Sequence, residues 1–234
     1  MALVQLLRQS AHLDLHQGLI AESLVYSTLQ SGPEFAAWRA GRPPPPRAEA
    51  NPEPAVLVRR CGDRLHLTLN RPDRHNAFSA EMRDAVVEGL QLAVSDASIR
   101  EVRIDGAGSS FCSGGDLGEF GSLPDPATAH GIRSTRNAAR LLAACADRAR
   151  VFVHGACVGA GVELPAFAGR VVAAEDAFFE LPELSMGLVP GAGGTVSIPR
   201  RVGRQRTALL ALTGMRLDAG RALRWGLVDA VGRE

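Results

Sequence analysis

Hydrophobic residues recur at roughly helical spacing, with gaps, through the first 30 residues of the chain. Gly32 and Pro33 interrupt this pattern, and residues 33–38 look like a short second helix with proline in its first turn. Residues 43–54 begin with four consecutive prolines, which favour an extended polyproline II path. The pattern therefore predicts a helical segment over residues 1–42 and a proline-rich linker over residues 43–54.

From residue 55 onward, short apolar runs alternate with longer amphipathic stretches. The apolar runs predict strands over residues 56–58, 65–69, 102–104, 151–153, 171–173 and 227–228. The amphipathic or small-residue stretches predict helices over residues 79–94, 128–146, 159–168, 207–212 and 219–223. Because strands and helices alternate without a visible repeat, we expect one mixed α/β domain built in layers.

The basic residues narrow the chemistry, because all 26 are arginine and none is lysine. This composition excludes a Schiff-base lysine and the lysine of a phosphate-binding P-loop. With a formal net charge of +1, the chain has no broad basic field, and no nucleic-acid partner is predicted. The six histidines are scattered without metal-ligand spacing, so no metal site is predicted either.

The cysteines and the hydropathy indicate where the protein works. The four cysteines lie far apart and form no C-x-x-C pair. Since no sustained apolar run follows Arg8, a secretory signal is not expected, and free thiols in a reducing cytoplasm are. No stretch approaches the ~20 consecutive apolar residues of a membrane span. We therefore predict a cytoplasmic protein with no membrane partner.

Two small-residue turns, at Gly114-Gly115 and at Gly159-Ala160, are candidates for ligand contact. The second is not a dinucleotide-binding fingerprint, since Leu164 stands where glycine or alanine is required. Each turn precedes a possible helix start, where unpaired N–H groups and a partial positive charge can polarise a carbonyl oxygen. The alternative is that these glycines serve ordinary turns and helix starts.

Two glutamates, Glu163 and Glu183, lie in apolar stretches of sequence. A buried carboxyl group needs a partner, and burial raises its pKa towards neutrality, where it can act as an acid or a base. Two backbone donors beside two such carboxyls would hold an oxyanion and move protons next to it. A structural ion pair is the alternative for Glu163.

Several stretches match a known family in order and spacing. They are residues 70–77 (NRPDRHNA), 111–117 (FCSGGDL), 154–164 (HGACVGAGVEL), 181–183, 187–195 (GLVPGAGGT), 202–204 and 212–214. With them, residues 55–230 resemble the crotonase (enoyl-CoA hydratase/isomerase) superfamily. The resemblance implies an α/β fold over residues 55–234: a crotonase-like spiral of strand–strand–helix units with a helical trimerisation segment.

Carried over by position, the resemblance implies that the backbone N–H groups of Gly115 and Ala160 hold the thioester oxygen of an acyl-CoA. Alanine keeps its N–H where the family often has glycine, so the donor survives. The positions that match the CoA-binding segments are Arg74, His75, Ala77, Ser113, Gly114, Asp116 and Leu117. The CoA thioester is the substrate, and no separate cofactor is implied.

Glu163 and Glu183 match the two glutamates of the family's hydratases, where one activates water for addition to Cβ and the other handles the proton at Cα. Family isomerases typically keep only the glutamate that matches Glu183. The resemblance therefore implies an acyl-CoA lyase that hydrates a 2-enoyl-CoA to a 3-hydroxyacyl-CoA through a stabilised enolate. Isomerisation or thioester hydrolysis on the same fold, or a non-catalytic acyl-CoA-binding subunit, are the alternatives.

Residues 22–43 look like the helical tail that family members carry after the position matching Val231. We therefore predict a circular permutation in which the usual C-terminal helices stand at the N-terminus. An unrelated helical extension is the alternative. The resemblance also implies a homotrimer, or a hexamer made of two trimers.

Overall fold

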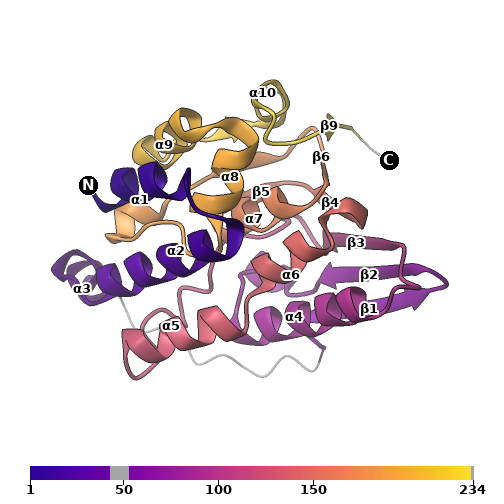
Figure 1. Cartoon of the computed structure of the whole chain (residues 1–234), viewed down its shortest axis with the longest axis horizontal. Coiled ribbons are helices and arrows are strands. Elements are labelled where there is room, and N and C mark those ends of the chain that lie inside the picture. Colours follow the sequence, from indigo (N-terminus) through magenta and orange to yellow (C-terminus); the bar gives the residue numbers. More distant parts are fainter. Residues whose placement is uncertain (43–52, 233–234) are drawn as a thin grey trace.

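The fold is organised around a six-stranded sheet in the computed structural model, which describes residues 1–42 and 53–232 (Figure 1). Its strands, in spatial order, are β1 (Val56–Cys61), β2 (Arg64–Leu69), β3 (Glu101–Gly106), β4 (Ala149–Val153), β6 (Arg170–Ala173) and β9 (Ala230–Val231). β1 and β2 form an antiparallel hairpin, and each later pair is parallel. The predicted mixed α/β class is confirmed.

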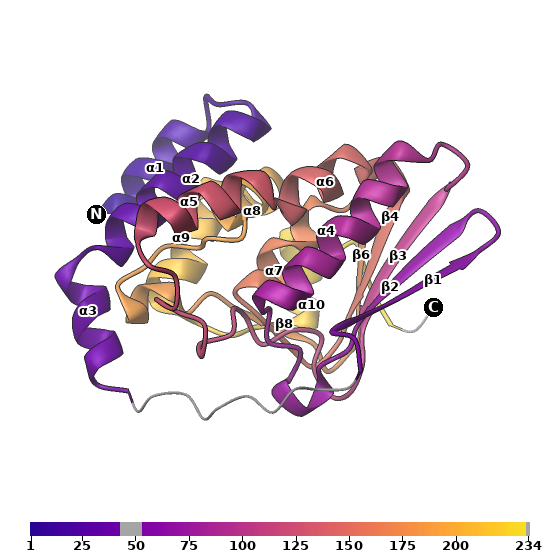
Figure 2. The same cartoon turned by 90° about the horizontal axis from the view of Figure 1, so that it is seen from below.

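This sheet has one buried and one polar face, as the alternation along β2 indicates. Leu65 and Leu67 are fully buried. His66 and Thr68 point to the other face, where each hydrogen-bonds Asp105 of β3 over 2.8 Å. Figure 2 shows the helices gathered on one side of the sheet, so the hydrophobic core lies between that side and the helices.

Helix α4 (Ala80–Ser95) packs against β1 and β2 and begins where the sequence predicts. Ser79 is its N-cap, and the Ser79 hydroxyl accepts a hydrogen bond from the Met82 N–H at 3.2 Å. This bond satisfies one of the N–H groups that a helix start leaves unpaired. The cap fixes the start of α4 directly after Phe78, which lines the cavity described below.

The single helix predicted over residues 128–146 is wrong, because the chain forms α5 (Pro126–Thr135) and α6 (Ala138–Ala144) instead. Asn137 stands between them with an extended backbone, and its side chain accepts a hydrogen bond from the Arg140 N–H at 2.9 Å. An asparagine that caps a new helix start competes with continuation of the old helix. The break lets α5 lean over the cavity while α6 packs on α4.

A second, smaller sheet is formed by strands from the C-terminal half of the chain. Its strands are β5 (Ala156–Val158), β7 (Phe178–Glu180) and β8 (Leu217–Asp218). Strands of two or three residues are too short to leave a periodic pattern, which is why the sequence did not predict them. After β5, the helix predicted over residues 159–168 is only α7 (Ala160–Glu163) and the 3₁₀ turn η3 (Pro165–Phe167), since proline disrupts a continuing helix.

The remaining helices of the described residues lie towards the two ends of the chain. Those in the last third are α8 (Gly194–Val202), α9 (Arg204–Thr213) and α10 (Ala219–Trp225). Those in the N-terminal segment are α1 (Ala2–Ser10), α2 (Leu15–Gln30) and α3 (Pro33–Ala40). The last strand is β9 rather than the predicted residues 227–228. α1 packs on α8 and α9, and α2 packs on α5 and α8 (Figure 1). The N-terminal helices thus cover the core beside α5 and α8.

The predicted polyproline linker falls mostly on residues 43–52, which lie outside the described residues. Across residues 1–42 and 53–232, no helix combines the length and the apolarity needed to cross a bilayer.

Candidate active site

A cavity of about 740 Å³ opens between the N-terminal helices, α5 and the loops that follow the strands. Of the residues predicted for the site, those in its wall are Ser113, Gly114, Gly115, Asp116, Leu117, Ala160, Glu163 and Glu183. Arg74, His75 and Ala77 do not belong to the wall. The structure therefore brings together both predicted backbone donors and both predicted carboxyls, although they come from distant parts of the chain.

Gly115 and Ala160, here called the donor pair, lie on two segments that are hydrogen-bonded side by side. The Cys112 N–H donates to the Ala156 carbonyl at 3.1 Å, and the Val158 N–H donates to the Cys112 carbonyl at 2.9 Å. These bonds pair Cys112 with Cys157 of β5 in a short parallel bridge. Both donors follow this bridge, so their spacing is set by backbone hydrogen bonds.

The donor pair keeps its own N–H groups free. Phe78 exchanges hydrogen bonds with the residues on either side of Gly115, and Ala160 is the first residue of α7, which has no preceding helical turn. Within the described chain, neither the Gly115 N–H nor the Ala160 N–H has an acceptor. Two unpaired amides on a cavity wall can hold an oxyanion.

Glycine at position 161 allows the two segments to approach each other. A Cβ atom there would lie 2.4 Å from the Cys112 carbonyl oxygen, far inside van der Waals contact. Gly159 has a φ of +50°, and a Cβ on it would lie 2.6 Å from Oε1 of Glu183. These small residues are therefore required by close approach as well as by turn geometry.

Asn76, a residue that sequence reasoning missed, holds the donor loop from behind. It is fully buried at a φ of +53°. Its side-chain amide donates to the carbonyls of Ala107 and Ser110, both at 2.8 Å, and its Oδ1 accepts from the Arg71 N–H at 2.8 Å. An asparagine directly after a proline-containing turn is the available sequence signal, because asparagine tolerates the left-handed region.

Glu163 is buried at the end of α7, against the turn that opens α8. Its Oε2 accepts hydrogen bonds from the Ala192 N–H at 2.7 Å and the Gly194 N–H at 2.8 Å. Burial raises the pKa of Glu163 to about 7, and these backbone hydrogen bonds limit the rise. Glu163 can therefore gain and lose a proton near neutral pH.

Glu183 begins the 3₁₀ turn η4 (Glu183–Met186), directly after β7. Since β5 and β7 are parallel, Glu183 and Ala160 leave the small sheet at the same edge. In the described chain, the buried Oε2 of Glu183 has no hydrogen-bond partner. Burial and the nearby charge of Glu163 hold the pKa of Glu183 well above its usual value, so the protonated form is favoured.

A third carboxyl, Glu22 of α2, faces the same turn and was not predicted. It is 2% exposed and accepts hydrogen bonds from the Gly193 N–H at 2.6 Å and the Thr195 N–H at 2.8 Å. The Thr195 hydroxyl donates a further bond at 2.7 Å. Burial, and next the charge of Glu163, raise the pKa of Glu22 to about 8.

Four consecutive amides of the α8 turn are thus divided between two carboxyls, with residues 192 and 194 bonded to Glu163 and residues 193 and 195 to Glu22. Glu22, Glu163 and Glu183 are called the carboxyl cluster below. The missed signal was that Glu22 lies three residues after Leu19 and four before Tyr26, on the buried face of a helix.

The residues matched to CoA-binding segments are divided between two places. Asp116 lies in the cavity wall and pairs with Arg71 at 2.9 Å, while Leu117 is 45% exposed at the cavity edge. Arg74 pairs with Asp73 at 3.7 Å, and His75 Nδ1 lies 3.2 Å from the Ser110 hydroxyl. Nothing in the described residues groups three or more His, Cys, Asp or Glu side chains for a metal ion.

Comparisons with known proteins identify the family to which the chain is similar. The family model described as enoyl-CoA hydratase/isomerase matches residues 65–234. The chain is 38% identical to 1,2-epoxyphenylacetyl-CoA isomerase of Escherichia coli over 168 residues, which cover 70% of this chain and 64% of the relative. It is 36% identical to 2,3-dehydroadipyl-CoA hydratase of the same organism over 176 residues, with 75% and 68% covered.

Solved structures show the same relationship. An enoyl-CoA hydratase from Thermoplasma volcanium superposes with a TM-score of 0.70 at 33% identity, over 78% of this chain and 73% of that one. An enoyl-CoA hydratase/isomerase from Mycobacterium paratuberculosis gives 0.71 at 32%, over 77% and 73%. The crotonase-like fold is confirmed, whereas the circular permutation stays a prediction. The match spans 64% of the length of the first Escherichia coli relative and 68% of the second. On this evidence the chain belongs to the enoyl-CoA hydratase/isomerase family.

Proposed function

We propose that this chain hydrates a 2-enoyl-CoA to a 3-hydroxyacyl-CoA. The observation that carries the proposal is the pairing of Glu163 with Glu183 beside the donor pair in one cavity. Glu163 has hydrogen bonds that stabilise its charge, while Glu183 has a buried oxygen with no partner in the described chain. One carboxyl is thereby suited to act as a base and the other as an acid.

The proposed reaction uses each of these groups once. The N–H groups of Gly115 and Ala160 hold the thioester oxygen and stabilise its negative charge as the enolate forms. Glu163 takes a proton from water as the water oxygen bonds to Cβ, and the C=C electron pair moves toward the thioester. Glu183 then gives its proton to Cα, which completes addition of one water. Proton transfer from Glu163 to Glu183 restores the starting state.

The direct test is the absorbance of the enoyl-thioester band with crotonyl-CoA. With wild type the absorbance of crotonyl-CoA should fall, whereas with Glu163→Gln it should persist, because the amide cannot accept the water proton. Glu175→Gln, at an exposed acid outside the cavity wall, is the matched control and should behave as wild type. Equal rates in wild type and Glu163→Gln would refute the assigned role of Glu163.

Double-bond isomerisation is a second candidate, favoured by the position of Glu183. Its Oε1 lies close to Gly159, next to the Ala160 amide, so it can move a proton at Cα without help from Glu163. A relative of this chain is named an isomerase. A 3-enoyl-CoA substrate separates the two functions, since isomerisation would create the enoyl-thioester band and would persist in Glu163→Gln.

We further propose that the protein assembles as a homotrimer or as two stacked trimers, as the family resemblance implies. Light scattering coupled to size-exclusion chromatography tests this proposal. A mass of about 74 kDa or 148 kDa, three or six times 24.7 kDa, is expected, and a monomer would overturn it.

A further inference from the structure

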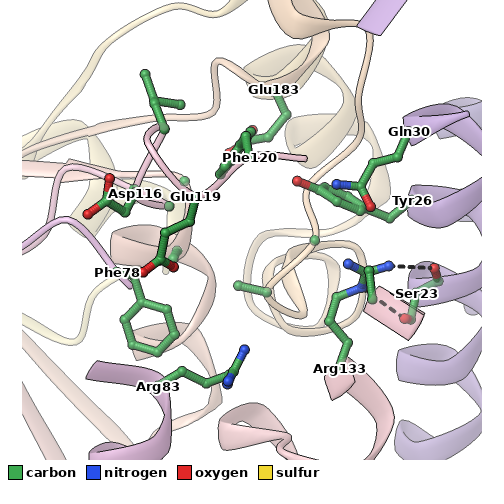
Figure 3. A pocket seen from close by; sticks show the side chains of 18 of the residues that line it. Ser23, Tyr26, Gln30, Phe78, Arg83, Asp116, Glu119, Phe120, Arg133 and Glu183 are labelled. Atoms are coloured by element: carbon green, nitrogen blue, oxygen red, sulfur yellow. Dashed lines mark hydrogen bonds between the residues drawn. The ribbon is translucent and has the colours of Figure 1, made fainter. Parts of the chain in front are cut away.

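One wall of the cavity is polar and is built where α2 packs on α5. Ser23, Tyr26 and Gln30 come from α2, and Arg133 comes from α5. Figure 3 shows these four side chains together, across the cavity from Asp116 and Glu119. Since Asp116 belongs to the segment expected to contact CoA, the Arg133 wall lies on the opposite side, where the far end of an acyl group can reach.

Arg133 is held in place by hydroxyl and carbonyl groups. Its Nε donates to the Ser23 hydroxyl at 3.0 Å, and its Nη2 donates to the Ser27 hydroxyl and, at 3.5 Å, to the Ser23 carbonyl. The guanidinium Cζ lies 4.7 Å from the centre of the Tyr26 ring. These contacts orient the guanidinium without neutralising its charge.

Arg133 lacks the partner that an inward-facing guanidinium normally has. Among the described residues, no carboxylate lies within ion-pair distance of it, and its Nη1 donates to no acceptor. Arg83 and Arg136 also line the cavity, but each has a carboxylate within 4.0 Å. Two further lining arginines are exposed to solvent: Arg39, which donates to the Gly121 carbonyl, and Arg42, which lies over the Trp38 ring. A charge removed from water needs a partner, so the unpaired face of Arg133 is suited to an anion in the cavity.

The Glu22 carboxyl does not meet this need. Burial lowers the pKa of Arg133, and the nearby Glu22 partly opposes this shift. Both carboxyl oxygens of Glu22, however, are already bonded to Gly193 and Thr195. Glu22 is therefore directed at the α8 turn, not at Arg133.

The Tyr26 hydroxyl beside Arg133 can add a hydrogen bond to the same ligand. Burial raises the pKa of the Tyr26 hydroxyl, so it remains a protonated donor, and within the described chain it has no hydrogen-bond acceptor. The buried side-chain oxygen of Gln30 also lacks a partner in the described residues, but it is an acceptor and cannot hydrogen-bond a carboxylate. A fork of guanidinium N–H groups beside a phenol fits the two oxygens of a carboxylate.

We propose that Arg133, assisted by Tyr26, binds a carboxylate at the far end of the acyl chain, so that the preferred substrates are CoA monothioesters of unsaturated dicarboxylic acids. This inference rests on the proposed function for its reaction but not for its binding step. It assigns selectivity to the contact between α2 and α5. An apolar acyl chain would leave the guanidinium facing hydrocarbon, which is unfavourable.

The test compares thioesters that differ only at the far end of the chain. Calorimetric titration of wild type with the saturated adipyl-CoA and hexanoyl-CoA should show roughly ten- to a hundredfold tighter binding of the diacid. Arg133→Met should remove this preference and leave hexanoyl-CoA binding unchanged or tighter. Arg136→Met, at a neighbouring cavity arginine with its own carboxylate, should keep the preference.

Three binding results would overturn the proposed carboxylate site. Equal binding of the two thioesters by wild type overturns the proposal, as does a diacid preference that survives in Arg133→Met. Equal weakening of both thioesters in Arg133→Met also overturns it, because Arg133 would then hold a phosphate of CoA. Tyr26→Phe, which removes only a hydroxyl, should lower the diacid preference several-fold and supports the test if Arg133→Met does not fold.

Turnover separates this inference from the proposed function. With trans-hex-2-enedioyl-CoA and trans-hex-2-enoyl-CoA, the KM for the diacid should rise about ten- to a hundredfold in Arg133→Met, while kcat changes little. If wild type binds the diacid preferentially but hydrates neither thioester, the hydratase proposal fails and the carboxylate site stands. If wild type hydrates both thioesters with equal KM, the hydratase proposal stands and the carboxylate site fails.

Discussion

The donor pair and the carboxyl cluster face the same cavity but are built in different ways. Gly115 and Ala160 present backbone N–H groups that are spaced by a bridge between Cys112 and Cys157. Glu22, Glu163 and Glu183 present side chains whose protonation depends on burial and on one another. The first region is fixed by backbone hydrogen bonds and close contacts, whereas the second responds to pH and to removal of single charges.

This difference determines how each region can be perturbed. An amide of the donor pair cannot be deleted by changing a side chain, because every residue except proline keeps its N–H. It can only be displaced, through the close contacts that Gly159 and Gly161 permit. The carboxyl cluster can instead be neutralised by Glu→Gln at nearly constant shape.

The largest effect is expected from Glu183→Gln. Because Glu183 is proposed to move the proton at Cα, this change should lower kcat by about 10²–10⁴ for hydration and for exchange of Cα protons in butanoyl-CoA with D2O. Glu163→Gln should lower hydration by a similar factor but keep the exchange, since the role proposed for Glu163 is to activate water. NMR of the exchange and the enoyl absorbance measure the two. Exchange lost equally in both variants would show that the carboxyls do not divide the work.

A somewhat smaller effect should follow when the donor pair is displaced. In Gly161→Ala, the new Cβ would lie 2.4 Å from the Cys112 carbonyl, so the two segments must separate. Since misplaced donors resemble lost ones, kcat/KM should fall roughly 10²–10³-fold, and overpacking should reduce stability by about 1–3 kcal/mol. Urea unfolding and steady-state kinetics measure both.

The control for that change is Gly131→Ala in α5, where a Cβ would meet no atom within 4 Å. Alanine is favoured over glycine within a helix, so stability should rise by roughly 0.5–1 kcal/mol with no loss of activity. A Gly161→Ala enzyme as active as this control would mean that the donor spacing is not set by the bridge.

The contrast between the two regions also explains what the sequence could predict. Glu163, Glu183, Gly115 and Ala160 were identified because each belongs to a short motif with local signals. The helical spacing of Glu22 with Leu19 and Tyr26 indicates that it is buried, but it does not indicate its partner. Gly193 lies 171 residues away, and a hydrogen bond of that range leaves no local pattern. The split between α5 and α6 was missed for the opposite reason: hydrophobic spacing continues across it, and only the side-chain cap of Asn137 ends the first helix.

Glu22 connects the N-terminal helices to the turn whose amides also bond Glu163. Glu22→Ala tests the effect of this connection on stability and activity. The change leaves the Gly193 and Thr195 N–H groups unpaired in a buried site, which should reduce stability by about 1–3 kcal/mol for each. The turn should shift and weaken the amide hydrogen bonds to Glu163, lowering kcat/KM about tenfold.

A purely structural role for Glu22 would lower stability alone, so the pH profile is the discriminating measurement. In wild type, kcat/KM should fall on the acid side of about pH 7, where Glu163 becomes protonated. Weaker amide hydrogen bonds should move this limb to higher pH in Glu22→Ala, because those bonds lower the pKa of Glu163. An unchanged limb would mean that the turn keeps its place without Glu22.

The last comparison concerns the pH dependence of stability, in a variant that leaves the proposed catalytic groups unchanged. The folded-state pKa of Glu22 is raised from 4.5 to about 8, so folding favours its neutral form. Its contribution to stability is therefore full below about pH 4.5 and is lost as the pH rises through 8. Urea midpoints for wild type should fall between pH 5 and pH 8.5, and Glu22→Gln, which cannot ionise, should fall less. Because other groups titrate equally in both proteins, the difference between the two slopes belongs to Glu22 and to its coupling with Glu163. Parallel slopes would mean that Glu22 is ionised throughout this range, with its backbone donors outweighing burial.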